Sequence, residues 1–103
     1  MKKEKQNYII KSAEYFWKEL EEIEMYMLEN LYQNTFLKFL ELLTFKLSLL
    51  IAFPKMYIEY DDNKKYRRFV VKNYVVFYKV DEENQIIHIV HIYYGRKVSF
   101  NLR

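Results

Sequence analysis

The sequence predicts an α+β domain in which a short N-terminal strand and a helical hairpin pack on an antiparallel β-sheet meander. Three observations indicate this class. Apolar residues recur every three or four positions in the first half of the chain, they recur every second position after Pro54, and the turns of the second half are short and polar. A chain of 103 residues is expected to form a single domain, 1–103.

The composition excludes several classes of protein. Hydrophobic residues make up 51% of the chain and aromatic residues 19%, which is incompatible with intrinsic disorder. The absence of cysteine excludes disulfides, zinc ribbons and thiol nucleophiles, and it fits a reducing, cytoplasmic location. A single glycine, Gly95, excludes glycine-rich phosphate loops. We therefore expect no cofactor, whether a metal or a small molecule.

The first half predicts a strand followed by two helices. A short strand is expected at Asn7–Ile10, and a helix is expected to begin at Ser12, whose hydroxyl is a candidate N-cap. Apolar residues at helical spacing form a stripe along this first helix, widened by two neighbours. The stripe comprises Phe16, Leu20, Ile23, Met27 and Leu31, and the neighbours are Trp17 and Leu28.

A second helix is expected after Tyr32–Asn34, with Asn34 or Thr35 as its cap and Pro54 ending it. This helix is apolar on every face, so we expect it to be covered on more than one side. Its segment 37–53 contains three charged residues, which argues against a membrane span, and no membrane partner is expected.

Strands are expected at Met56–Tyr60, Tyr66–Val71, Tyr74–Val80 and Gln85–Tyr94. The connection Lys72-Asn73 is typical of a tight hairpin. The helical stripes and strand faces together predict a core. Its expected members are Phe16, Leu20, Ile23, Leu40, Leu43, Leu47, Val70, Val76, Phe77, Ile87 and Ile89.

Charge is divided unevenly along the chain. Residues 1–63 carry 8 basic and 11 acidic side chains, a balance of −3, whereas residues 64–103 carry 9 basic and 3 acidic side chains, a balance of +6. A basic C-terminal half favours an anionic partner, either nucleic acid or an acidic protein segment.

Residues suited to catalysis are scarce. His88 and His91 stand three apart on one expected strand, so alternation would point them to opposite faces, and no metal site is expected. What remains is a basic and aromatic set near the ends of the strands, suited to binding phosphate, carboxylate or a stacked base. The same charges also serve to keep an apolar sheet soluble, and the residues alone leave both interpretations open. The set comprises Arg67, Arg68, Lys72, His91, Tyr93, Tyr94, Arg96 and Lys97.

The run Arg67–Asp81, the strand Ile86–Ile92 and the ending Tyr93–Lys97 resemble the C-terminal signature of the RelE/ParE superfamily, the toxins of bacterial type II toxin–antitoxin modules of the plasmid stabilisation type. Phe53-Pro54 and Leu20–Ile23 resemble the rest of its pattern, so the resemblance covers about residues 7–98. It implies a helical hairpin on an antiparallel sheet, the fold that periodicity also predicts.

The resemblance implies a cognate antitoxin as partner and one of two targets. ParE-like members poison DNA gyrase, whereas RelE-like members cleave messenger RNA on the ribosome without a metal. The strand Tyr74–Tyr78 lacks the arginine common in the ribonuclease branch, and Val98 stands where the family usually has an acidic residue. We therefore expect a ParE-like growth inhibitor. The alternatives are a RelE-like endoribonuclease, and a non-toxic structural or adaptor protein.

Under the gyrase hypothesis the chain is not an enzyme. Target or antitoxin contacts are then expected from Arg67, Arg68, Lys72, Tyr93, Tyr94, Arg96 and Lys97. Under the ribonuclease hypothesis the minimal catalytic set is Arg68, His91, Tyr94 and Arg96.

Overall fold

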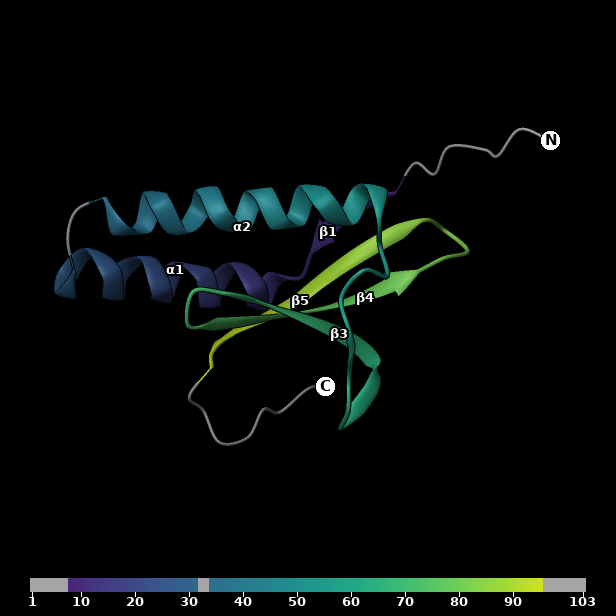
Figure 1. The fold of residues 1–103 in the computed structure, drawn as a ribbon. Coiled ribbons are helices and arrows are strands. Elements are labelled where there is room, and N and C mark those ends of the chain that lie inside the picture. The colour runs from purple at the N-terminus through teal and green to yellow at the C-terminus, as the bar shows by residue number, and fades with distance from the viewer. Residues whose placement is uncertain (1–7, 32–33, 96–103) are drawn as a thin grey trace.

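A computed structural model describes residues 8–31 and 34–95 of the chain (Figure 1). Two helices lie side by side on one face of a five-stranded sheet, so the expected α+β architecture is confirmed. The elements in chain order are β1 Ile9–Ser12, α1 Glu14–Asn30, α2 Thr35–Ala52, β2 Glu59–Tyr60, β3 Asn63–Val71, β4 Tyr74–Asp81 and β5 Ile86–Tyr94.

The sheet is mixed. Its strand order is β1-β5-β4-β3-β2; the last four elements form an antiparallel meander, while β1 pairs parallel to β5. Ile9 lies opposite Ile86 and Ser12 lies opposite Ile89, so the first strand of the chain is joined to the last.

The helices and the sheet enclose the main hydrophobic core. Buried side chains from the two helices meet those on the helix-facing side of β3, β4 and β5. The best-buried of them are Phe16, Phe39, Leu50, Val71, Val76, Tyr78, Ile87 and Ile89. A smaller cluster of Tyr66, Phe77 and Val90 lies on the opposite side of the sheet, which we call the outer face. Burial of apolar surface in these two clusters is the main term that stabilises such a domain.

Several expected details of the first half are wrong. Ser12 is the last residue of β1 and not an N-cap, because Ala13 N–H donates to Ile89 O at 2.9 Å and extends the pairing with β5 before α1 begins. Trp17 and Leu28 do not join the core; both are more than half exposed. Their positions lie to one side of the buried stripe, where neither the sheet nor α2 covers them.

The strand expected at Met56–Tyr60 is reduced to β2, Glu59–Tyr60. The carbonyl groups of Lys55 and Tyr57 accept hydrogen bonds from the Arg67 guanidinium, at 3.3 and 2.7 Å, and therefore do not join the ladder. Conversely β3 begins earlier than expected, at Asn63.

The hairpin between β3 and β4 is confirmed. Val71 pairs with Tyr74, and Lys72 adopts φ 57°, the left-handed conformation that such two-residue turns require. Val70, expected in the core, points to the outer face and is 44% exposed.

Strand β5 contains a β-bulge. Phe77 pairs with His91 and Tyr78 with Ile89, which leaves Val90 as an extra residue. Simple alternation would place residues 89 and 92 on opposite faces of the sheet, because they are three positions apart. The extra residue Val90 removes this difference, so Ile87, Ile89 and Ile92 all reach the main core. Every residue after Val90 therefore has the opposite orientation to that which simple alternation predicts.

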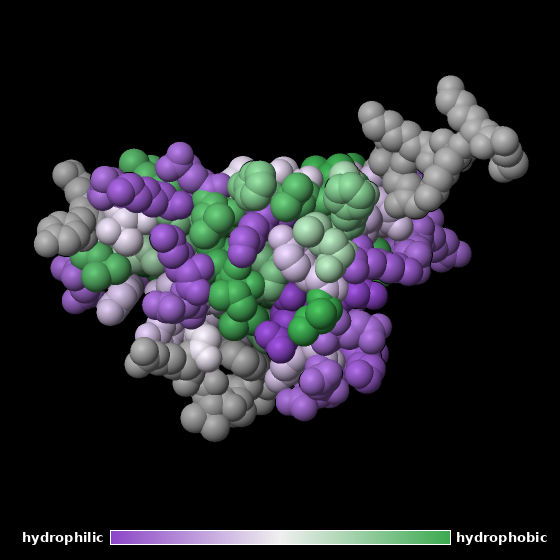
Figure 2. Space-filling model, in the orientation of Figure 1, coloured by the Kyte–Doolittle hydropathy of each residue, from purple (hydrophilic) through white to green (hydrophobic). Residues whose placement is uncertain are grey.

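Helix α2 packs against both α1 and the sheet, as expected, but it leaves several large apolar side chains exposed. Leu37 is 62% exposed and Phe45 59%, and Figure 2 shows exposed apolar side chains along α2 interspersed with polar ones. Within the described residues, neither helix is long and apolar enough to cross a membrane.

Candidate functional site

The edge of β5 is open beyond the point where β1 ends. β1 pairs with β5 only as far as Ile89, so among the described strands nothing pairs with this side of residues 90–94. A side chain of helix α1, Glu19, takes the place of the missing strand. Oε1 of Glu19 accepts the Ile92 N–H at 3.0 Å, and Oε2 lies 2.9 Å from Nδ1 of His91.

The His91 ring is held between two tyrosines. Its centroid lies 5.2 Å from that of Tyr15 and 4.9 Å from that of Tyr93, and both pairs are stacked. His91 is buried and bound to Glu19, so its imidazole is fixed rather than presented to a substrate.

A cleft of about 440 Å³ lies between α1 and the open end of β5. Its walls are carboxylate, tyrosine and isoleucine side chains from α1, β4 and β5. They are Glu19, Glu22, Ile23, Tyr26, Tyr74, Ile92, Tyr93 and Tyr94. This volume lies within the range of ~300–1,000 Å³ that is usual for ligand-binding clefts.

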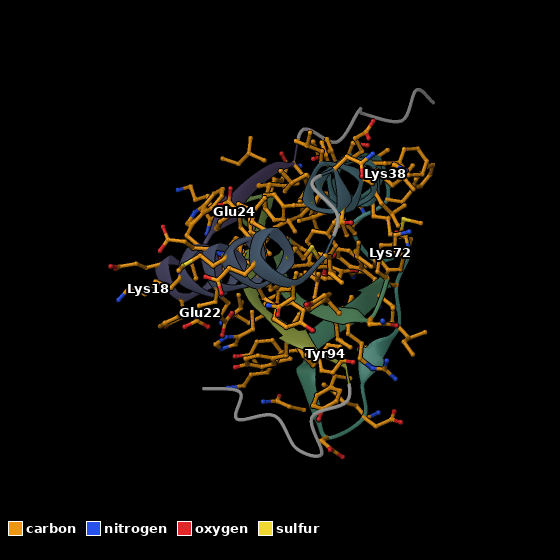
Figure 3. All side chains as sticks on the ribbon, turned by 90° about the vertical axis from the view of Figure 1, so that its left-hand side faces the viewer. Lys18, Glu22, Glu24, Lys38, Lys72 and Tyr94 are labelled. Carbon is orange, nitrogen blue, oxygen red and sulfur yellow. The ribbon has the colours of Figure 1, made fainter. Side chains whose placement is uncertain are left out.

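Tyr94 contributes to this cleft and not to the outer face. Its ring packs edge-on against Tyr74, with the centroids 5.5 Å apart, and it lies below α1 on the same side as Glu22 (Figure 3). Burial raises the pKa of Tyr74 above 10.0, and the neighbouring hydroxyls of Tyr26 and Tyr94 raise it further. The Tyr74 phenol therefore stays neutral, and the tyrosines of the cleft offer hydroxyl groups and ring surfaces to a ligand.

Arg67 and Arg68 point to opposite faces, as alternation predicts. Arg67 faces the helices, where its guanidinium binds Lys55 O and Tyr57 O and lies 3.8 Å from Glu59. These contacts attach the segment after α2 to β3. The position of Arg67 is thus that of a structural clamp.

Arg68 lies on the outer face. Its Nε is buried and has no hydrogen-bond partner among the described residues. It pairs in register with Phe77, which in turn pairs with His91, so the three form a row across β3, β4 and β5. Two strand spacings separate Arg68 from His91, about 10 Å, and the buried Phe77 ring lies between them.

The remaining members of the basic and aromatic set lie in different places. Lys72 is exposed at the β3–β4 turn, and Tyr93 packs beside Phe77 on the outer face. Arg96 and Lys97 lie outside the described residues. The structure thus brings His91 together with Tyr93, whereas it places Arg68 and Tyr94 on opposite sides of the sheet.

The expected orientation of the two histidines is wrong. Through the bulge, His91 pairs with Phe77 while His88 pairs with Lys79; both partners belong to the outer face, since Lys79 lies over the Tyr66 ring. His88 and His91 therefore share one face. The described residues nevertheless hold no group of three or more His, Cys, Asp or Glu side chains placed to bind a metal ion.

The acidic wall of the cleft was not among the expected site residues. Glu19 and Glu22 belong to a run of glutamates that reads as a solvent-facing surface. One sequence pattern does distinguish Glu19 and Glu22 from the other glutamates. Tyr15, Glu19, Glu22 and Tyr26 recur at spacings of 4, 3 and 4, so they form a second helical stripe beside the buried one.

Comparisons with known proteins complete the description. Residues 10–98 match the family described as ParE toxin of type II toxin-antitoxin system, parDE. The fold is similar to that in the crystal structure of the archaeal RelE–RelB complex from Pyrococcus horikoshii OT3, with a TM-score of 0.55 and 19% identity over 89% of this chain and 99% of that one. A comparison with curated proteins gave no match.

Proposed function

The chain belongs to the ParE toxin family of type II toxin–antitoxin systems, and we propose that it inhibits bacterial growth by acting on DNA gyrase in the cytoplasm until a cognate antitoxin neutralises it. The observation that carries this proposal is the family match, which spans residues 10–98 and so nearly the whole chain.

The arrangement of side chains favours gyrase over messenger RNA as the target. A metal-independent ribonuclease must bring a base, an acid and a cation to one phosphate. Of the four residues that such an activity would use here, Tyr94 lies in the cleft, Arg68 lies on the outer face, and His91 is bound to Glu19. Arg96 lies outside the described residues. The described part of the set is thus dispersed.

Two features support a protein partner for this chain. The exposed apolar side chains of α2, Leu37 and Phe45 among them, offer a surface for a helix. Beyond the Glu19 contact at Ile92, the end of β5 has no strand partner among the described residues and offers an edge for an extended segment. The similar archaeal protein was crystallised as a RelE–RelB complex, which fits the same interpretation.

Induction of the chain in bacteria, with and without the adjacent small open reading frame, tests the proposal. We expect arrest of growth without the second frame and rescue with it. Purified protein is expected to inhibit supercoiling by gyrase or to trap cleaved DNA–gyrase complexes. Normal growth in both strains would contradict the toxin function and would favour a structural or adaptor role.

A RelE-like ribonuclease is the second candidate, favoured by the structural similarity to an archaeal RelE. Mapping of messenger RNA ends after induction separates the two targets. Cleavage within ribosome-bound message, reduced by Arg68→Ala, Tyr94→Phe or Arg96→Ala, would replace gyrase as the target. Loss of one charge-stabilising donor commonly lowers such a rate by ~10²–10³.

A further inference from the structure

The cleft between α1 and the open end of β5 has a chemistry that the basic character of the C-terminal half does not suggest. Its charged groups are carboxylates, Glu19 and Glu22, and its apolar walls include the rings of Tyr26, Tyr74 and Tyr94. We propose that this cleft binds the guanidinium group of an arginine side chain contributed by a protein partner.

The two carboxylates differ in what they can offer a ligand. Both oxygens of Glu19 already have partners, in His91 and in the backbone of Ile92. Glu19 is therefore held in place as part of the cleft wall. Glu22 is exposed at the mouth of the cleft and has no hydrogen-bond or ion-pair partner in the part of the chain that the structure describes. Glu22 is therefore the group able to accept hydrogen bonds from an incoming cation.

The tyrosine rings favour a planar cation. Guanidinium groups stack on aromatic faces and bind carboxylates through two parallel N–H donors, whereas an ammonium is compact and strongly hydrated. Tyr26, which is more than half exposed on α1, and Tyr94 of β5 both line the cleft, so each offers a ring surface to a flat group. An acidic ligand is disfavoured, because no described basic side chain lines the cleft.

The open edge of β5 explains why the arginine is expected from a protein. Beyond Ile89 no described strand lies on this side of β5, so an extended segment can approach the cleft without displacing part of the sheet. The identity of that protein as the antitoxin rests on the function proposed above; the arginine specificity rests on the cleft alone.

NMR titration of the isotope-labelled protein tests the site directly. The probe is N-acetyl-arginine methylamide, and the matched control is the citrulline derivative, which has the same shape without the charge. We expect the arginine probe to shift resonances of Glu22, Tyr26 and Tyr94, and the citrulline probe to bind at least about fivefold more weakly. Equal binding of the two probes would overturn the proposal.

Two variants locate the binding. Glu22→Gln and Tyr26→Ala are each expected to weaken binding of the arginine probe about two- to fivefold, as is usual for an exposed ion pair and an exposed cation–π contact. Glu24→Gln is the control, because Glu24 lies on the opposite side of α1 from Glu22 and Tyr94 (Figure 3). If Glu24→Gln weakens binding as much as Glu22→Gln does, the effect is one of net charge and the cleft is not the site.

The affinity of the toxin for its antitoxin provides a second, independent test. Glu22→Gln is expected to weaken the purified toxin–antitoxin complex, and Glu24→Gln is expected to leave its affinity unchanged. If the antitoxin neutralises both variants equally while the probe still distinguishes them, the cleft binds arginine but the partner is another protein. If induction shows no toxicity at all, the proposed function fails while the probe titration still decides the cleft.

Discussion

The carboxylate of Glu19 lies 2.9 Å from Nδ1 of His91, a residue 72 positions away in the sequence. The same carboxylate accepts the Ile92 N–H, so one side chain of α1 satisfies two groups at the edge of β5. This contact takes the place of the strand pairing that ends at Ile89.

We predict that Glu19→Ala lowers the free energy of unfolding by about 1–3 kcal/mol, because it leaves the Ile92 N–H and the His91 ring without their acceptor. Urea denaturation followed by circular dichroism measures the change. Glu21→Ala is the control, since Glu21 is exposed on the same helix. Equal stability of the two variants would mean that the Glu19 contact contributes nothing.

Leu43→Ala is predicted to cost about 2–5 kcal/mol, the usual effect of truncating a buried leucine. Leu43 is 3% exposed within the main core. On the same helix, Leu37 offers a matched control, and Leu37→Ala is expected to change the free energy of unfolding by less than about 0.5 kcal/mol. Thermal or urea unfolding compares the two, and a large loss in Leu37→Ala would contradict the exposure of that side chain.

Structural features that depend on local sequence patterns could be predicted from the sequence. The apolar spacing correctly identifies Phe16, Leu20, Ile23 and Met27 as the buried face of α1, because a helix repeats locally. It is wrong for Leu31, which is 47% exposed because α1 ends at Asn30. The turn at Lys72 was also predictable, because it depends on two adjacent residues between two strands. Both features depend on residues close together in the chain.

What could not be predicted depends on distant partners. Val90 resembles its apolar neighbours, so nothing in the sequence marks it as the bulge that reverses the orientation of Tyr93 and Tyr94. Glu19 resembles the other glutamates of α1 until β5 is placed beside it. The cleft, unlike the helices, exists only once the whole sheet has formed.

Alkaline pH is predicted to destabilise the protein through Tyr78. This hydroxyl donates to Pro54 O at 3.0 Å, and burial raises the pKa of Tyr78 from 10.0 to about 12. Between about pH 10 and pH 12 the folded chain keeps a proton that the unfolded chain releases, so the free energy of unfolding falls as the pH rises through this window. Below about pH 10 the group has no such effect.

Urea denaturation over a series of alkaline pH values, on the wild-type chain and on Tyr78→Phe, measures this contribution. The variant is expected to be less stable at neutral pH, since it leaves Pro54 O without its donor, but to lose less further stability above about pH 10. Burial also raises the pKa values of Tyr57, Tyr66 and Tyr74, so part of the alkaline loss remains in the variant. Parallel pH profiles of the two chains would contradict the assignment.

The two neighbouring arginines are predicted to respond differently to substitution. Arg67→Lys loses the guanidinium, whose Nη1 donates to the Lys55 and Tyr57 carbonyls while its Nη2 lies near Glu59, and we expect a loss of about 1–3 kcal/mol. Arg68→Lys removes a buried Nε that has no partner among the described residues, so no comparable loss is expected. Thermal unfolding checks both. If Arg68→Lys is the more damaging change, the assignment of Arg67 as the clamp is wrong.

The parallel pairing of β1 with β5 also has a consequence for synthesis of the chain from its N-terminus. β1 is made before the other strands of the sheet, but its partner Ile86–Ile89 is made after β4, and β5 lies between β1 and β4 in the finished sheet. A nascent or prematurely terminated chain that lacks β5 has neither the strand beside β1 nor the wall of the cleft opposite α1. For a protein of a toxin family, this order delays completion of the folded sheet until β5 has been translated.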